Sequence, residues 1–172
     1  NVTQPIYLNT HPDEVKSPDA LLQDFASLRN QFPTLTLVME MHEGAVTDLG
    51  LMRDLQRELK RQKIGLAYDD FGAGQARLLE LAHATPEVVK FDIAFIRNID
   101  KAPPQQVELL KMLVNMVCHM GVQSLAEGVG EAAEAAICET LPFNLYQGFH
   151  YARPESLEHL LSHSPITQLH RR

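Results

Sequence analysis

Two adjacent carboxylates, Asp69 and Asp70, stand between the apolar run Leu66-Ala67-Tyr68 and the glycines Gly72 and Gly74. Neighbouring anions repel, and burying either one unpaired is costly, so we expect a cation close by. A divalent metal ion is the simplest candidate, because the glycines permit a turn that brings both carboxylates to one site. The alternative is a strand end with one solvated aspartate and one that caps a helix.

Further charged side chains stand at or near the ends of apolar runs. Glu40 ends the apolar run in LVMEMHE, and Glu43 follows three residues later. Glu40 is either a hard oxygen ligand for Mg²⁺ or Mn²⁺ or a solvated strand terminus. His42 is set aside, because a single histidine among oxygen donors is usually incidental. Lys90, in EVVKFD, either faces a site where it orients water or offsets phosphate charge, or it lies on a solvated face.

Three more polar residues repeat this position. Asn9 follows Ile6–Leu8, Glu127 ends the apolar part of SLAEGVG, and Gln147 follows a run in LYQGFHYARP. Each signal is weak alone, and their agreement in position is the evidence. Motifs of other chemistries are missing from the sequence: there is no Gly-x-Ser-x-Gly elbow, P-loop or Cys-x-x-Cys pair, and GAG lacks the third glycine of a dinucleotide fingerprint.

The elements that must position these residues alternate along the chain, which predicts parallel strands and an α/β fold. Because nearly every strand would end in a useful polar group, a TIM-like (β/α) barrel is favoured over an open sheet. Eight strands normally need about 250 residues, so we expect a barrel that lacks its first two strands. The six predicted strands are Ile6–Leu8, Leu35–Glu40, Ile64–Asp69, Val88–Asp92, Val122–Glu127 and Phe143–Gln147.

Two of the intervening helices are clear from their spacing. One is expected to face the core with Leu49, Met52, Leu55 and Leu59 and to expose its basic residues to solvent. The other is predicted from Gln106 to Met120, after Pro103-Pro104 and before Gly121. Its inward residues are expected to be Leu109, Leu110, Leu113, Val114 and Val117.

Composition narrows the classes of function. The chain has 172 residues, 45% of them hydrophobic, which suits one globular domain. A formal net charge of -7 disfavours binding to a DNA or RNA duplex. Only Cys118 and Cys138 occur, which suits a reducing compartment, and neither a leader nor a membrane-length apolar run is present. We therefore expect a cytoplasmic segment without membrane contact.

Six motifs in order resemble the EAL domain family, whose members are cyclic di-GMP phosphodiesterases built on a TIM-like barrel. LVMEMHE is similar to the family's Leu-Glu-Ile-Thr-Glu, and LAYDDFGAG to its Asp-Asp-Phe-Gly-(Thr/Ala)-Gly. LAEGV is similar to Ala-Glu-Gly-Val. The remaining three similarities are carried by YLNTH, VVKFD and YQGFHYARP, and the whole covers about residues 5–160.

The resemblance implies metal-dependent hydrolysis of cyclic di-GMP to linear pGpG in bacterial signalling, with a pair of Mg²⁺ or Mn²⁺ ions. It assigns catalytic roles to Lys90, Glu127 and Glu43, and ligand contacts to Gln147, Asp70 and Asn9. It also implies that the metal ligands are Asn9, Glu40, Asp69, Asp70 and Glu127. The domain is expected over residues 1–162, with a polar tail over 163–172, inside a larger multidomain signalling protein for which a monomer and a homodimer are both left open.

Three departures from the family pattern leave alternatives open. The strand with the Glu-Ala-Leu motif is missing, Gly130 replaces an acidic residue although Glu131 follows, and Gln75-Ala76-Arg77 replaces Tyr-Ser-Ser. The intact domain is expected to be an enzyme. The alternatives are a catalytically impaired EAL domain that senses cyclic di-GMP, and a barrel enzyme for another phosphoester.

Overall fold

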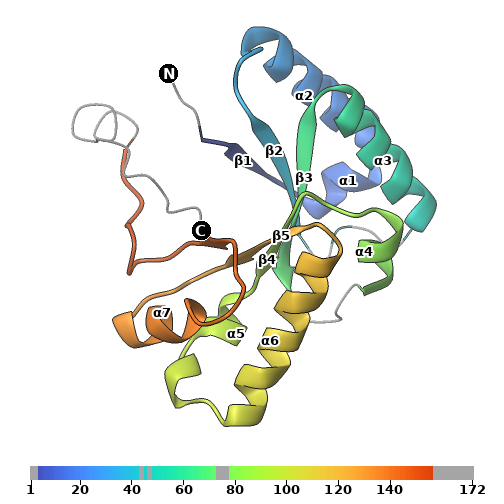
Figure 1. Ribbon diagram of the computed structural model, residues 1–172. Helices are drawn as coiled ribbons and strands as arrows, with labels where there is room; N and C mark the ends of the chain where they lie inside the picture. The colour runs from blue at the N-terminus through green and yellow to red at the C-terminus, as the bar shows by residue number, and fades with distance from the viewer. Residues whose placement is uncertain (1–3, 43–44, 46–47, 73–77, 157–172) are drawn as a thin grey trace. The chain divides into compact units, whose positions relative to one another are not determined.

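The computed structural model describes residues 4–42, 45, 48–72 and 78–156, and strands and helices alternate through these ranges (Figure 1). The fold is α/β, with six strands in one sheet in chain order, β1-β2-β3-β4-β5-β6. The pairs β1–β2, β2–β3 and β5–β6 are parallel. The predicted alternation of parallel strands with helices is therefore confirmed.

The chain divides into two compact units, Asn1–Lys90 and Phe91–Arg172. The first unit holds β1 (Ile6–Thr10), α1 (Pro12–Lys16), α2 (Pro18–Gln31), β2 (Leu37–His42), α3 (Leu49–Arg61), β3 (Ile64–Phe71) and α4 (Leu78–His83), and most of β4 (Val88–Phe91). The second unit holds α5 (Ile93–Ile96), the 3₁₀ helix η1 (Ile99–Lys101), α6 (Pro104–His119), β5 (Gln123–Ala126), α7 (Ala132–Cys138) and β6 (Leu145–Tyr146). The expected domain end at residue 162 and the tail over 163–172 lie outside the described residues.

In the first unit, the sheet is covered well enough to bury its central strand. Residues 37–41 of β2 are all buried, and only His42 at its end is exposed. Such burial on both faces is typical of a parallel strand beneath crossover helices. Helices α2 and α3 lie side by side along β2 and β3 (Figure 1).

Helix α3 forms where the spacing predicted it. The Asp48 carboxylate caps its start and accepts the N–H groups of Gly50 and Leu51 at 2.7 and 2.9 Å. Burial of a large apolar side chain contributes about 1.5–3 kcal/mol, so the inward face holds the helix on the sheet. That face is Met52, Leu55 and Leu59, and the exposed basic residues are Arg53, Arg57, Lys60 and Arg61.

Helix α6 in the second unit corrects one predicted core residue. It begins at Pro104 and is followed by Gly121 at φ 77°, as expected from the proline and glycine signals. Leu110, Val114 and Val117 are buried along it, but Leu109 is 52% exposed. At about 100° per residue, Leu109 turns away from the line that the three buried residues define.

Three strands at the candidate site end later than predicted. β1 runs to Thr10, β2 to His42 and β3 to Phe71, each two residues past its predicted end. The backbone pairing continues through the polar residues, since His42 pairs in register with Asp69. Polar side chains do not end a strand as long as its ladder partners persist. In the opposite sense, β6 keeps only Leu145 and Tyr146.

Among the described residues, none of the helices combines the length and apolar character needed to span a membrane. Cys118 and Cys138 are free thiols. Burial raises the pKa of Cys138 to about 12, which keeps this thiol protonated and unreactive.

Candidate functional site

The sheet register gathers polar side chains onto one face of the first unit. Asn9 of β1 pairs in register with Glu40 of β2, Glu40 pairs with Ala67, and His42 pairs with Asp69. Register partners in a parallel sheet project to the same side, and so do residues two apart along a strand. Asn9, Glu40, His42 and Asp69 therefore share a face near the carboxyl ends of their strands.

Lys90 of β4 reaches two of these carboxylates. Its Nζ lies 2.6 Å from Glu40 Oε1 and 2.8 Å from Asp69 Oδ1. The side chains of Lys90 and Glu40 are only 5% and 7% exposed, and that of Asp69 is 17% exposed. The solvated alternatives for Glu40 and Lys90 are thus excluded, because both groups are buried and paired.

The charges of this Glu40–Lys90–Asp69 cluster do not balance. Two carboxylates share one ammonium group, which leaves one net negative charge in a buried place. Within the described ranges, the buried Oδ1 of Asp69 has the ionic contact with Lys90 but no hydrogen-bond partner. A buried charge that is incompletely compensated is costly, so the cluster suits a further cation.

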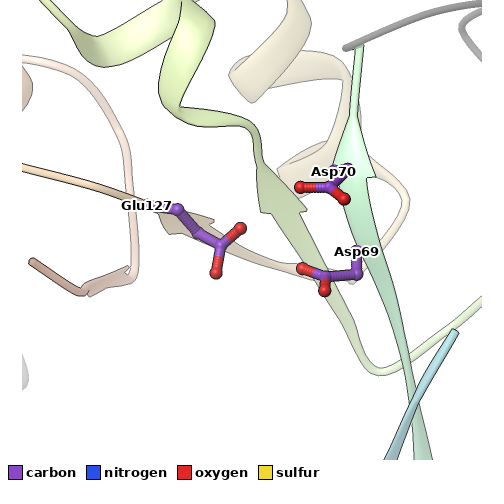
Figure 2. Close-up of side chains that lie close together, drawn as sticks. All are labelled: Asp69, Asp70 and Glu127. Carbon is purple, nitrogen blue, oxygen red and sulfur yellow. The ribbon is translucent and has the colours of Figure 1, made fainter. Parts of the chain in front are cut away.

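Asp70 is turned toward the same side as Asp69 by its backbone. Successive strand residues normally point to opposite faces, but Asp70 has φ 55°, in the left-handed region. Figure 2 shows both carboxylates on one side of β3. Gly72 follows at φ 93°, while Gly74 lies outside the described residues. The predicted turn therefore begins at Asp70 itself.

His42 contacts Asp70, a pairing that the sequence analysis missed. His42 Nε2 lies 2.9 Å from Asp70 Oδ2, with the two side chains 53% and 31% exposed. The sequence did contain a signal for this contact. His42 lies two residues after Glu40, and side chains two apart on a strand point to the same face. Asp70 thus contacts a histidine side chain and is not a simply solvated aspartate.

Tyr7 is a second residue that sequence reasoning missed. It lies on β1 two residues before Asn9, so it shares the face of the site. Burial raises the pKa of the Tyr7 phenol, and the Glu40 charge raises it further, while Lys90 opposes the change. The phenol therefore stays protonated and can donate a hydrogen bond near the acidic cluster.

The remaining first-unit candidates are less constrained. Asn9 is exposed, although its register places it beside Glu40. Glu43 lies outside the described residues, so its predicted role stays a prediction.

In the second unit, Glu127 and Gln147 are held by interlaced loops. Glu127 directly follows β5, is half-buried, and its N–H donates to Phe91 O at 3.2 Å (Figure 2). The N–H of Gln147 donates to Ala126 O at 2.9 Å, and the N–H of Val129 donates to Gln147 O at 3.0 Å. The backbone thus fixes both residues at adjacent strand ends, while the Gln147 side chain is exposed.

Two glycines make this close approach of the loops feasible. Gly128 has φ 69°, and a Cβ there would lie 2.4 Å from Ile93 Cγ1. Gly148 has φ 155°, and a Cβ there would lie 2.1 Å from Val129 O. Any larger residue would push apart the loops that carry Glu127 and Gln147.

Glu134 anchors the segment where the chain departs from the family pattern. Its buried carboxylate accepts the N–H groups of Asn98, Gly130 and Glu131 at 2.7, 2.9 and 3.1 Å. Burial acts to raise the pKa of Glu134, but these three N–H groups outweigh it and hold the pKa below its usual value. Gly130 and Glu131 therefore belong to a hydrogen-bonded turn at the start of α7.

The chain is similar in sequence to a known family and to characterised proteins. The EAL domain family model matches residues 1–154. The cyclic di-GMP phosphodiesterase RocR of Pseudomonas aeruginosa is 28% identical over 165 residues, which cover 93% of this chain and 42% of RocR. The chain therefore spans less than half of that relative.

Solved structures give the fold. The EAL domain of Mycobacterium smegmatis DcpA has a TM-score of 0.76 at 22% identity, covering 87% of this chain and 67% of that one. Klebsiella pneumoniae BlrP1, in a manganese and cyclic di-GMP complex, has a TM-score of 0.77 at 27% identity, covering 88% of this chain and 39% of BlrP1. These likenesses confirm the predicted TIM-like barrel class. With the family model matching most of its length, this chain belongs to the EAL domain family.

Proposed function

We propose that the protein hydrolyses cyclic di-GMP to linear pGpG with a pair of divalent ions, Mg²⁺ or Mn²⁺. RocR is named a cyclic di-GMP phosphodiesterase, and BlrP1 binds manganese together with cyclic di-GMP. The observation that carries the proposal is the buried Glu40–Lys90–Asp69 cluster. Its net negative charge and the buried Asp69 Oδ1 suit a cation at the carboxyl ends of the strands.

The donor set suits hard divalent ions. Carboxylate and amide oxygens are the ligands that Mg²⁺ and Mn²⁺ prefer. We assign one ion to Asn9, Glu40, Asp69 and Glu127, and the second to Asp70. In the first unit, Asp69 and Asp70 place two carboxylates on one side of β3, which supports their assignment to the ions (Figure 2).

Bound divalent ions would supply Lewis-acid stabilisation of the phosphodiester charge and water of lowered pKa. The chain's own groups have separate tasks. Lys90 holds Glu40 and Asp69 in place and offers an ammonium that can orient water or offset phosphate charge. Glu127 is assigned to catalysis as well as to the metal, Gln147 to contact with the nucleotide, and Glu43 to support of the loop after Asp70.

The reaction balances with water alone. One water adds to phosphorus, one bridging P–O bond breaks, and the leaving 3′-oxygen takes a proton, which opens the ring to a linear dinucleotide with a 5′-phosphate. The ligand carries two phosphate charges and the chain a formal charge of -7. Cations must therefore offset the repulsion, which the metals and Lys90 can do.

The test is product analysis with the full-length protein that carries this chain. We expect linear pGpG to form from cyclic di-GMP in Mg²⁺ or Mn²⁺ and to vanish in EDTA. A second phosphodiester, such as bis(p-nitrophenyl) phosphate, serves as the comparison substrate. Bound cyclic di-GMP without any turnover would end the enzymatic proposal, and turnover of only the comparison substrate would redirect it to another phosphoester.

The second candidate is a catalytically impaired sensor of cyclic di-GMP. Lys90 already offsets part of the charge of Glu40 and Asp69, so this cluster can persist without metal. Gly130 also replaces an acidic residue of the family pattern. Calorimetry separates the two functions, since nucleotide binding that persists in EDTA and yields no linear product favours the sensor. A homodimer, a multidomain parent protein and a cytoplasmic location stay predictions.

A further inference from the structure

The pair formed by His42 and Asp70 differs from the rest of the acidic cluster. His42 ends β2, and its Nε2 lies 2.9 Å from Asp70 Oδ2. Lys90, the other cation, contacts Glu40 and Asp69. An ammonium group has no lone pair and cannot bind a metal, whereas a neutral imidazole can. The two adjacent aspartates therefore have neighbours of different chemistry.

The backbone brings His42 and Asp70 to one side of the sheet. His42 pairs in register with Asp69, and the positive φ of 55° at Asp70 turns the next carboxylate toward the same side. The juxtaposition is therefore set by strand register and one unusual backbone conformation. A surface ion pair of this exposure contributes little to stability, so stability alone gives weak grounds for the arrangement.

We propose that His42 supplies Nε2 as a nitrogen ligand to the divalent ion held by Asp70, which makes this metal position more selective for transition metals than for Mg²⁺. The inference rests on the metal site of the proposed function. Imidazole suits Zn²⁺, Ni²⁺ and similar ions, whereas sites of oxygen alone suit Mg²⁺.

The observed spacing fits two ligands on one ion. Metal–nitrogen and metal–oxygen bonds of about 2.1 Å at right angles place the two donor atoms about 3.0 Å apart. The distance between His42 Nε2 and Asp70 Oδ2 is 2.9 Å. An ion could therefore bind both atoms without a change in strand register. The exposure of both side chains leaves a route for the ion to enter.

The site assigned to Asp69 and Glu40 has a neighbour of different chemistry. Its cationic neighbour is Lys90, which offsets charge without coordinating. One metal position would then be all oxygen and the other mixed oxygen and nitrogen. This difference predicts a selectivity between ions that the carboxylates alone would not produce.

The experiment compares the full-length protein with its His42→Asn variant. Isothermal titration gives the affinities for Mg²⁺, Co²⁺ and Zn²⁺, and pulsed electron paramagnetic resonance of bound Mn²⁺ detects coupling to nitrogen. We expect His42→Asn to lose at least about tenfold in affinity for Co²⁺ and Zn²⁺, with little change for Mg²⁺. The imidazole nitrogen coupling should disappear.

His11→Asn is the matched control. His11 also lies beside an aspartate, with its Nδ1 3.7 Å from Asp13 Oδ2, but it caps the start of α1 and is assigned to neither ion. This variant should keep the metal affinities and the coupling. Circular dichroism will check that His42→Asn is folded. The nitrogen coupling of Mn²⁺ bound to the unmutated protein is a further test that needs no variant.

Bound Mn²⁺ without imidazole coupling, or an equal loss of affinity for all three metals, would overturn the inference while leaving hydrolysis untouched. Imidazole coupling without any turnover of cyclic di-GMP would support the inference and contradict the proposed function. The two proposals therefore fail separately.

Discussion

Polar groups gather at both ends of β2 and β3, but they are satisfied in different ways. Before the strands, Arg29 donates to the backbone oxygens of Leu35, Gln62 and Lys63 at 2.5, 3.2 and 2.8 Å. At the carboxyl ends, two carboxylates share Lys90, and Asp69 Oδ1 has no hydrogen bond among the described residues. The chain completes the first set of bonds by itself.

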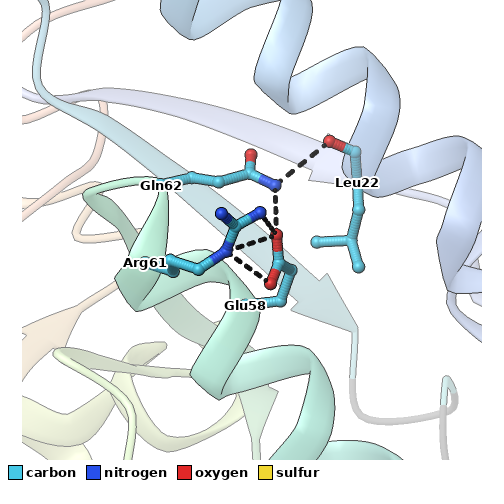
Figure 3. A network of polar contacts seen from close by, with 4 residues as sticks. All are labelled: Leu22, Glu58, Arg61 and Gln62. Atoms are coloured by element: carbon cyan, nitrogen blue, oxygen red, sulfur yellow. Dashed lines mark hydrogen bonds and ion pairs between the residues drawn. The ribbon is translucent and has the colours of Figure 1, made fainter.

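The amino-end network continues at the end of α3 (Figure 3). Arg61 Nε donates to both carboxylate oxygens of Glu58, at 3.1 and 2.9 Å. Gln62 Nε2 donates to Glu58 Oε1 at 3.0 Å and to Leu22 O at 3.4 Å. One neutral atom, Gln62 Oε1, is buried without a hydrogen-bond partner in the part of the chain that the structure describes, which is less costly than an unpaired charge.

The difference separates stability from function. At the amino ends of the strands, hydrogen bonds from Arg29 satisfy backbone oxygens of the same chain and stabilise the fold. At the carboxyl ends, Lys90 offsets part of the negative charge of Glu40 and Asp69, and the proposed divalent ions would offset the rest. Substitutions at the two ends should therefore affect different measurements.

The largest effect is expected for Asp69→Asn. The change removes a charge from the acidic cluster while keeping the side-chain shape, so turnover of cyclic di-GMP should fall on the order of a thousandfold with the fold intact. Steady-state kinetics and circular dichroism check this. Asp54→Asn on exposed α3 is the control and should leave turnover unchanged. Normal activity of Asp69→Asn would remove Asp69 from the metal site.

The next effect is expected for Lys90→Ala. It leaves Glu40 and Asp69 buried without their ammonium partner, which should lower the free energy of unfolding by about 3 kcal/mol without metal. The turnover number should fall far more than the affinity for cyclic di-GMP, and added Mg²⁺ should restore part of the stability. Kinetics and thermal unfolding in EDTA and in Mg²⁺ measure both.

Lys111→Ala is its control, because Lys111 is 50% exposed beside Glu108. Equal losses in rate and affinity on mutating Lys90 would argue against a catalytic role. A stability unaffected by the substitution would show that the buried pairings contribute little.

Arg29→Ala should act on stability alone. Losing charged donors to three backbone oxygens should cost about 2–3 kcal/mol, measured by urea unfolding. Turnover per folded molecule should stay the same, since these bonds lie before the strands. Arg53→Ala, on the exposed face of α3, should change stability by less than about 0.5 kcal/mol. A loss of turnover in folded Arg29→Ala would contradict the prediction that the amino ends of the strands affect stability alone.

The smallest effect is a pH dependence at Glu58. Hydrogen bonds from Arg61 and Gln62 lower the pKa of Glu58 from 4.5 to about 2. A lowered pKa stabilises the fold above about pH 4.5, and this contribution is lost as the pH falls toward 2. Glu58→Gln should therefore show a slightly smaller fall in melting temperature between pH 6 and pH 3. Identical profiles would contradict the pKa shift.

The sequence predicted the fold class and most strand positions because apolar runs and helical spacing are local signals. It predicted strand ends poorly, since backbone pairing continues through Asn9, Glu40 and Asp69. The prediction that Leu109 faces the core was wrong, because only one side of α6 is buried and Leu109 lies on the exposed side. The pattern along one strand predicts which of its residues share a face. It does not predict the residue that contacts His42 or the charges that act on Tyr7, because these lie on other strands.

The candidate site shows the same limit. The motifs identified Glu40, Asp69, Asp70 and Lys90, and the structure unites them in the first unit. That Lys90 bridges Glu40 and Asp69 depends on the neighbouring strands β2, β3 and β4, whose order in the sheet is not given by spacing along the chain. The left-handed backbone at Asp70 was also invisible, because glycine was the expected residue for such a conformation.

The central claim is that excess carboxylate charge at the strand ends binds divalent cations. Its most direct test counts the Mn²⁺ ions bound per chain, from the electron paramagnetic resonance signal of free Mn²⁺, in the full-length protein and in Asp69→Asn. The account predicts saturable binding of a pair of ions that is lost or strongly weakened in the variant. Equal Mn²⁺ binding by the two proteins, or none by either, would contradict it.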